Sequence, residues 1–141
     1  MKTRIRSVFK SDPALLEAMR ALTGKFLCGF SLSHERIQEI VLAVDEACSN
    51  AIRHAYANRP SEEIVLLLRS DGGGIEVVVA DKGKPMPHVK VKVAKGKPKK
   101  VPPEKVRPGG LGMKLMHRVF DEVHITTGEK KGNRVRMRLF F

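Results

Sequence analysis

The chain has 141 residues, a length that suits one domain with one hydrophobic core. Apolar residues make up 42% of the sequence and charged residues 30%, and no apolar run approaches the roughly 20 residues that a membrane-spanning helix needs. The formal net charge of +12 favours an anionic partner, which could be a nucleotide, a nucleic acid or an acidic protein.

The N-terminus and the cysteines indicate the compartment. The first residues, MKTRIRSVFKSDP, contain no apolar stretch of signal-peptide length, so nothing predicts export. Cys28 and Cys48 lie in segments with helical apolar periodicity, which predicts two buried thiols in a reducing cytoplasm. No CxxC or HExxH pattern accompanies them, so they do not predict a zinc site.

The first half of the chain predicts a strand, two helices and a hairpin. Residues 3–9 alternate as an edge strand does, and Ser11-Asp12-Pro13 starts a helix that ends near Gly29. A longer helix with a continuous apolar stripe is predicted over 33–56. Strands at 64–69 and 75–81 follow, joined by a turn at 71–74, and their nearly complete apolarity indicates central strands.

The second half begins with a segment at 82–110 that is rich in Lys, Pro and Gly. We name it the basic segment, and its length indicates either a functional lid or a solvated loop. A helix over 111–122, a strand over 123–127 and a strand over 133–141 complete the chain. This order predicts an α+β fold, a two-layer α/β sandwich with a mostly antiparallel sheet and helices on one face.

Polar residues at three places in this framework are candidates for chemistry. On a helical wheel Glu46 and Asn50 fall one turn apart on the side away from the core, with Arg53 between them in direction. Asn is a poor residue inside a helix, and a solvent-exposed position would suit another residue better. Asp81 ends an apolar strand, and Gly83 follows it in what could be a simple turn.

The third place is a group of glycines before the last helix, Gly109, Gly110 and Gly112. Closely spaced glycines at a helix N-terminus let backbone N–H groups approach an anion, and the helix dipole favours phosphate there. Glycines also simply end loops, so each of these three signals is weak when taken alone.

Together the three segments resemble the motifs of one superfamily. EACSNAIRHAY (46–56) is similar to the N-box, DKGKP (81–85) to the G1 box and RPGGLGMKLM (107–116) to the G2 box of the GHKL ATPases, the gyrase, chaperone, histidine-kinase and mismatch-repair group. Their order and the intervening strands also match. The sequence RIQEIVLAVDEACSNAIRHAY is most similar to the bacterial anti-sigma-factor serine kinases. The resemblance covers residues 1–141, and it implies one ATP-binding domain with a Bergerat-type fold and a basic lid at about 82–110.

The resemblance also implies a role for each motif. Asn50 would give one oxygen to Mg²⁺, and Glu46 would be the general base. Asp81 would accept a hydrogen bond from the adenine amino group of ATP. The other residues assigned to the nucleotide site are Arg53, Gly83, Arg107, Gly109, Gly110, Leu111, Gly112 and Asn133. Asn133 follows Gly132 where many relatives carry threonine, and its amide can both donate and accept.

The function that the resemblance implies is a cytoplasmic serine/threonine protein kinase that binds a sigma factor and phosphorylates an anti-sigma-factor antagonist. The alternative is a switch module that binds ATP and a partner but transfers phosphate slowly or never. Relatives often form dimers, so a homodimer is left open. The basic segment has no interleaved aromatic residue for base stacking, so nucleic acid is not the expected partner, and no membrane contact is expected.

Overall fold

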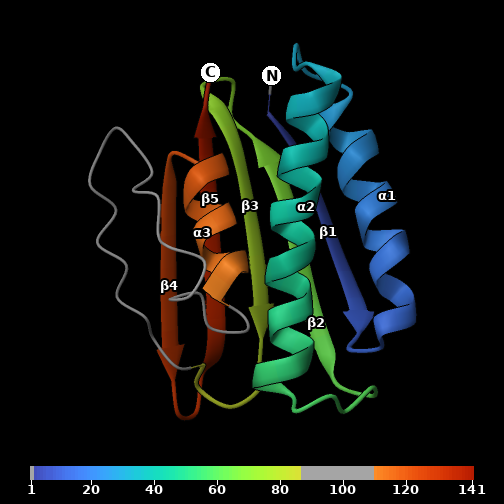
Figure 1. The fold of residues 1–141 in the computed structure, drawn as a ribbon, viewed down its shortest axis with the longest axis vertical. Helices are drawn as coiled ribbons and strands as arrows, with labels where there is room; N and C mark the ends of the chain where they lie inside the picture. The colour runs from blue at the N-terminus through green and yellow to red at the C-terminus, as the bar shows by residue number, and fades with distance from the viewer. Residues whose placement is uncertain (1, 87–109) are drawn as a thin grey trace.

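A computed structural model of the protein describes residues 2–86 and 110–141. Within this part of the chain, five strands form one antiparallel sheet in the order β1-β2-β3-β5-β4. The helices α1, α2 and α3 all lie on one face of that sheet (Figure 1). The predicted two-layer α+β architecture is therefore confirmed.

Each predicted element is present, with ends that differ by a few residues. The strands are β1 (Thr3–Lys10), β2 (Glu63–Ser70), β3 (Gly74–Asp81), β4 (Glu122–Gly128) and β5 (Gly132–Phe140). The α-helices are α1 (Leu16–Leu27), α2 (His34–Asn50) and α3 (Gly110–Val119). A 3-10 turn, η1 (Pro13–Leu15), precedes α1, and a π-helical turn, η2 (Ala51–Ala55), continues α2.

The strand predictions hold in space as well as in sequence. β1 is an edge strand, whereas β2 and β3 each have a neighbour on both sides. Their apolar residues line the core beneath the helices, where Ile64, Leu66, Leu68, Val77 and Val79 are at most 2% exposed. The sheet and its core thereby position the polar residues at the ends of α2, β3 and β5.

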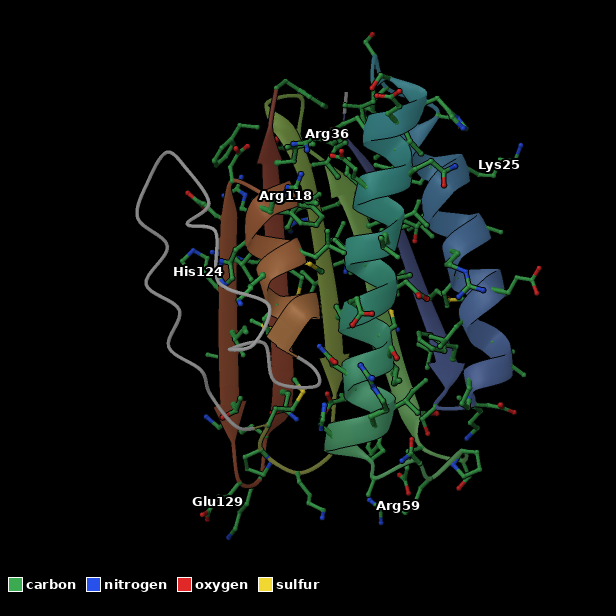
Figure 2. All side chains as sticks on the ribbon, in the orientation of Figure 1. Lys25, Arg36, Arg59, Arg118, His124 and Glu129 are labelled. Atoms are coloured by element: carbon green, nitrogen blue, oxygen red, sulfur yellow. The ribbon has the colours of Figure 1, made fainter. Side chains whose placement is uncertain are left out.

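Two helical segments, η1 and α2, begin with side-chain caps, and the cap before Pro13 is the one that the sequence predicts. Asp12 accepts a hydrogen bond from the backbone N–H of Ala14 at 2.9 Å, and Ser33 accepts one from that of Arg36 at 3.1 Å. Arg36 also reaches across from the start of α2 and donates to the carbonyl of Val119 at 2.8 Å. This contact joins the start of α2 to the end of α3, at the end of the molecule far from the polar strand ends (Figure 2).

The prediction of two buried cysteines is half wrong. Cys48 is buried, and burial raises the pKa of its thiol to about 12. Cys28 is exposed, because α1 ends at Leu27 and the next residue lies past the last helical turn, where the periodicity no longer fixes its direction. Among the described helices none is long and apolar enough to cross a membrane.

Candidate functional site

The last turn of α2 brings three polar side chains together. One nitrogen of Arg53, Nη2, donates to Asn50 Oδ1 at 2.9 Å and lies 3.6 Å from Glu46 Oε2. The Glu46 and Arg53 side chains stay partly exposed, at 32% and 43%. Arg53 therefore holds the carboxylate and the amide one turn apart on the same side of the helix.

Asn50 itself corrects a prediction from the helical wheel. Its side chain was placed on the solvent side, but the residue is only 7% exposed. A wheel drawn for one helix leaves out its neighbours, and α3 packs beside α2. The chain also changes from α-helix to π-turn after Asn50, which shifts the direction of the residues that follow. A buried amide needs partners, and Arg53 supplies one.

A second group of polar residues forms where β3 ends beside the start of β5. Asp81 and Asn133 are register partners on these neighbouring strands, and both are buried, at 6% and 3% exposure. Asn133 Nδ2 donates to Asp81 Oδ1 at 2.9 Å, and the backbone N–H of Gly83 donates to the same oxygen at 2.9 Å. Burial raises the pKa of the Asp81 carboxyl, and these hydrogen bonds oppose the rise only in part.

Asn133 also makes hydrogen bonds to the segment that follows β3. Its Oδ1 accepts from the backbone N–H of Met86 at 2.9 Å, and its Nδ2 also donates to the carbonyl of Lys84 at 2.7 Å. One amide thus satisfies groups on β3 and on residues 84–86. The role expected for Asn133 at the nucleotide remains a prediction, but its position next to Asp81 agrees with it.

The end of the long helix meets the same turn. The backbone N–H of Lys84 donates to the carbonyl of Ala55 in η2 at 2.9 Å. Tyr56, which follows η2, is 2% exposed, and its hydroxyl donates to the carbonyl of Glu63 at 2.6 Å and accepts from the N–H of Lys82 at 2.7 Å. Hydrogen bonds therefore connect the end of the helix, β2 and the turn after β3.

Two glycines permit this close packing. A Cβ added at Gly83 would collide with the backbone of Ala55, and one added at Gly132 would collide with the carbonyl of Asp81. Gly132 also has a φ of +75°, in the region that favours glycine. Gly83 was predicted to let the backbone approach the adenine base, and in this structure its lack of a side chain first serves the contact with η2.

The glycines before the last helix are only partly described. Gly110 is the first residue of α3, so Gly110, Leu111 and Gly112 supply backbone N–H groups from its first turn. Such groups have no partner within the helix and suit an anion. Arg107 and Gly109, with most of the basic segment, lie outside the described residues.

Sequence reasoning missed two residues of this end of the molecule, Tyr56 and Gly132. The helix prediction ends at Tyr56 and gives it no further role, although the hydroxyl of a buried tyrosine usually finds a hydrogen-bond partner. Gly132 was noted only as the residue before Asn133. Figure 2 shows Arg59 and Glu129, which lie in the loop after η2 and in the β4–β5 turn, at this same end.

Comparison with known proteins finds relatives named as serine-protein kinases and as anti-sigma factors. The chain is 37% identical over 95 residues to the serine-protein kinase RsbW of Oceanobacillus iheyensis, a match that covers 66% of this chain and 60% of that protein. It is 28% identical over 118 residues to the anti-sigma F factor of Anoxybacillus flavithermus, covering 84% and 79%. The chain thus spans about 60% of the length of the RsbW kinases that it matches.

A solved structure and a family match agree with these relatives. The crystal structure of the RsbU and RsbW domains of a Mycobacterium tuberculosis protein superposes with a TM-score of 0.69 at 19% identity, covering 98% of this chain and 32% of that one, which supports the fold. Residues 9–139 match the family described as the histidine kinase-like ATPase domain. That match covers nearly the whole sequence and carries all three motifs, and the chain therefore belongs to the histidine kinase-like ATPase family.

Proposed function

We propose that this protein binds ATP with Mg²⁺ and is a serine/threonine protein kinase of the anti-sigma-factor type. The family is one of ATPase domains, which implies ATP binding. The observation that carries the kinase proposal is the placement of Glu46 and Asn50 on one side of α2, both held by Arg53. A carboxylate that can act as a general base, one turn from an amide oxygen that can bind Mg²⁺, suits phosphoryl transfer to a hydroxyl.

Asp81 would recognise the adenine. Both hydrogen bonds described above reach Oδ1, so the carboxylate is already oriented before a ligand arrives. The adenine amino group is a donor and a carboxylate accepts only, so this pairing favours ATP over GTP. Gly83 and Asn133 keep the chain around the carboxylate in place.

Asn50 would supply an oxygen to Mg²⁺, which neutralises phosphate charge and takes most of its remaining ligands from phosphate and water. In this structure Asn50 Oδ1 accepts from Arg53. A guanidinium and a metal ion cannot share that oxygen well, because both are positive. Arg53 would therefore release Asn50 and turn to a phosphate, which its partly exposed side chain allows.

Glu46 would accept the proton of the attacking hydroxyl. The serine or threonine oxygen of the substrate forms a bond to the terminal phosphorus of ATP, the bond to the bridging oxygen breaks, and ADP leaves. Backbone N–H groups of the first turn of α3, from Gly110, Leu111 and Gly112, would stabilise the phosphate charge. Arg107 and Gly109 are proposed for the same end of the ligand.

The partners follow from the relatives and remain part of the proposal. A sigma factor and an anti-sigma-factor antagonist, the latter as phosphorylation substrate, fit relatives named serine-protein kinase RsbW and anti-sigma F factor. A single domain over 1–141, a cytoplasmic location and a homodimer are proposed on the same ground. Light scattering of the purified protein with and without nucleotide tests the homodimer.

The experiment that tests the kinase uses Glu46→Gln, which keeps the size and removes the base. Labelled ATP is incubated with the protein and with binding partners captured from its native cytoplasm, and transfer to each partner is measured. We expect Glu46→Gln to bind Mg·ATP as the wild type does and to transfer phosphate at least about a hundredfold more slowly. Glu39→Gln, a matched change on the exposed part of the same helix, should transfer at the wild-type rate.

Three results would change the proposal. If the wild type binds no ATP, the assignment of the site is wrong. If it binds ATP but transfers no phosphate to any partner, the switch module replaces the kinase. If Glu46→Gln transfers as fast as the wild type, the kinase stands and Glu46 is not its base.

A further inference from the structure

The face of the sheet opposite the helices carries an unusual pattern of side chains. Successive residues of a strand point to opposite faces, so the neighbours of the core residues in each strand lie on this second face. We call it the open face, because no described helix lies against it (Figure 1). Its residues are Arg4, Arg6, Val8, Lys10, Glu63, Val65, Leu67, Arg69, Glu76, Val78, Ala80, Glu122, His124, Thr126, Arg134, Arg136, Arg138 and Phe140.

The basic residues of the open face form two columns. One column runs along β1 with Arg4 and Arg6, and the other runs along β5 with Arg134, Arg136 and Arg138. Two strands, β2 and β3, separate the columns. With neighbouring strands about 4.8 Å apart, the columns stand roughly 14 Å from each other.

The acidic residues of the open face neutralise only one end of it. Glu76 is 5% exposed and pairs with Arg69 at 2.8 Å and with Arg138 at 3.7 Å. Among the described residues no salt bridge reaches Arg4, Arg6, Arg134 or Arg136, although the first three are exposed. Arg136 even keeps a buried Nε that has no described hydrogen-bond partner. Positive charge is therefore left over in both columns.

An apolar strip lies between the columns. One register row reads Arg6, Leu67, Val78, Arg136, and the next reads Val8, Val65, Ala80, Arg134. Between the columns Val65 and Ala80 are partly exposed, whereas Leu67 and Val78 are only 9% and 3% exposed. Val8, which lies on β1 beside Arg6, is 48% exposed. The open face thus offers apolar contact along the row of Val8, Val65 and Ala80, with cations on both sides.

We propose that the open face binds an acidic amphipathic helix of a partner protein. An α-helix with its side chains is about 10–12 Å across, which fits between columns roughly 14 Å apart. Its apolar stripe would pack on the strip, and Asp or Glu residues on both flanks would pair with the arginines, which bind carboxylates in a bidentate manner. This inference does not depend on the ATP site, which lies at the helix side and one end of the sheet.

The same observations argue against two other occupants. A second copy of this chain would bring arginine columns against arginine columns, and like charges brought together repel. A nucleic acid would use the cations but not the apolar strip, and the middle of the face has no aromatic residue on which a base could stack. A partner that is both acidic and apolar uses every feature of the face.

The test measures binding of a labelled 18-residue peptide by fluorescence anisotropy. The peptide is helical, with leucines on one stripe and glutamates on both flanks, and a control peptide has the same composition in shuffled order. The variant Arg6→Glu/Arg134→Glu reverses one exposed charge in each column. The matched control Lys25→Glu/Arg118→Glu makes the same charge change at exposed residues of α1 and α3 on the helix side (Figure 2).

We expect the wild type to bind the striped peptide at least tenfold more tightly than the shuffled one, and binding to weaken as salt rises. Arg6→Glu/Arg134→Glu should lose at least tenfold in affinity, Val8→Ser about threefold, and Lys25→Glu/Arg118→Glu little. Thermal unfolding and Mg·ATP binding confirm that each variant is folded, and Arg6→Gln/Arg134→Gln replaces the reversal if it is not.

Several outcomes would overturn the proposal. No preference for the striped peptide, or equal loss in the two charge variants, removes the helix as occupant. Tighter binding of a random 20-base-pair DNA duplex than of the peptide, lost in Arg6→Glu/Arg134→Glu, assigns the face to nucleic acid. Dissociation of a wild-type dimer by the same variant assigns it to a second copy. None of these results bears on ATP binding, which is measured separately.

Discussion

At the scale of single residues, Asp81 joins more parts of the site than its place at the end of a strand indicates. Its carboxylate accepts from Gly83 and from Asn133, and the residues that meet it come from β3, the turn after β3 and β5. The resemblance of residues 81–85 to the G1 box marks Asp81 and Gly83 as candidates for the nucleotide site. The triple hydrogen bonding of Asn133 could not be predicted, because it depends on which turn residues approach β5 in space.

Asp81→Asn should weaken ATP binding and leave the fold intact. The substitution replaces one acceptor oxygen with an NH₂ group, which would face the donors of Gly83, of Asn133 or of the adenine. A hydrogen bond to a charged group contributes about 1.5–3 kcal/mol, so the affinity should fall roughly ten- to a hundredfold. Calorimetry with Mg·ATP measures it, and unchanged affinity would remove Asp81 from the adenine site.

The raised pKa of Asp81 makes both stability and ATP affinity depend on pH, in opposite directions. The folded protein holds this proton more tightly than the unfolded chain, so the contribution of Asp81 to stability is fully present below its ordinary pKa of 3.8 and is lost as pH rises through the raised value. ATP affinity should instead rise through the same range, because the carboxylate accepts better when ionised.

The measurement for this pH dependence compares the wild type with Asp81→Asn. ATP itself titrates, so the affinity of each protein is measured across the acidic range and the difference is taken. The wild type should show a transition that Asp81→Asn lacks. Parallel curves for the two proteins would contradict the assignment.

Asn50 marks the limit of residue-level prediction. The periodicity of α2 correctly separates most core positions from exposed ones, and it gives Glu46 its partly exposed place. It fails for Asn50, which is only 7% exposed and directly precedes a π-turn, because a pattern for one helix contains neither the neighbouring elements nor that turn. Cys28 fails for a related reason, since it stands just past a helix end.

At the scale of elements, the proposed nucleotide site depends on how the start of β5 passes the end of β3. Alternation and capping residues correctly predict that β1 is an edge strand, that β2 and β3 are central strands joined by a hairpin, and that a helical segment starts after Asp12. The close approach of β5 to Asp81 is set by Gly132, and sequence patterns show a glycine in a turn without showing what it touches.

Gly132→Ala should therefore destabilise the protein by disturbing the close contact between Gly132 and Asp81. Alanine at a φ of +75° costs about 1–2 kcal/mol, and its Cβ would also push against the carbonyl of Asp81. We expect a loss of at least about 2 kcal/mol in the free energy of unfolding, measured by urea denaturation, and weaker ATP binding.

The matched control for this prediction is Gly128→Ala, in the partner position of the same hairpin. A Cβ there would meet Lys131 Cβ at 3.6 Å, an ordinary contact, so the stability should change by less than about 1 kcal/mol. Equal losses in the two variants would show that the hairpin, and not the contact with Asp81, is what Gly132 preserves.

At the scale of the whole molecule, the two faces of the sheet serve different tasks. The helices cover one face, and the residues that we propose for ATP binding lie where η2 meets the ends of β3 and β5. The other face keeps its arginine columns free of described salt bridges at four positions. The sheet therefore carries part of the positive net charge of the chain, in addition to the lysines of the basic segment.

Because ATP would contact α2, the turn after β3 and α3 at once, its binding should stabilise the whole fold. At an Mg·ATP concentration a hundred times its Kd, the stabilisation is about 2.7 kcal/mol, which for a domain of this size raises Tm by roughly 8–10 °C.

Asn50→Ala should retain the smaller shift that the wild type shows with ATP and EDTA, since the metal-dependent part is lost. Gln38→Ala, an exposed amide on the same helix, should show the full shift. Differential scanning calorimetry measures these shifts. If ATP raises the Tm of the wild type equally with Mg²⁺ and with EDTA, Asn50 is excluded as a metal ligand.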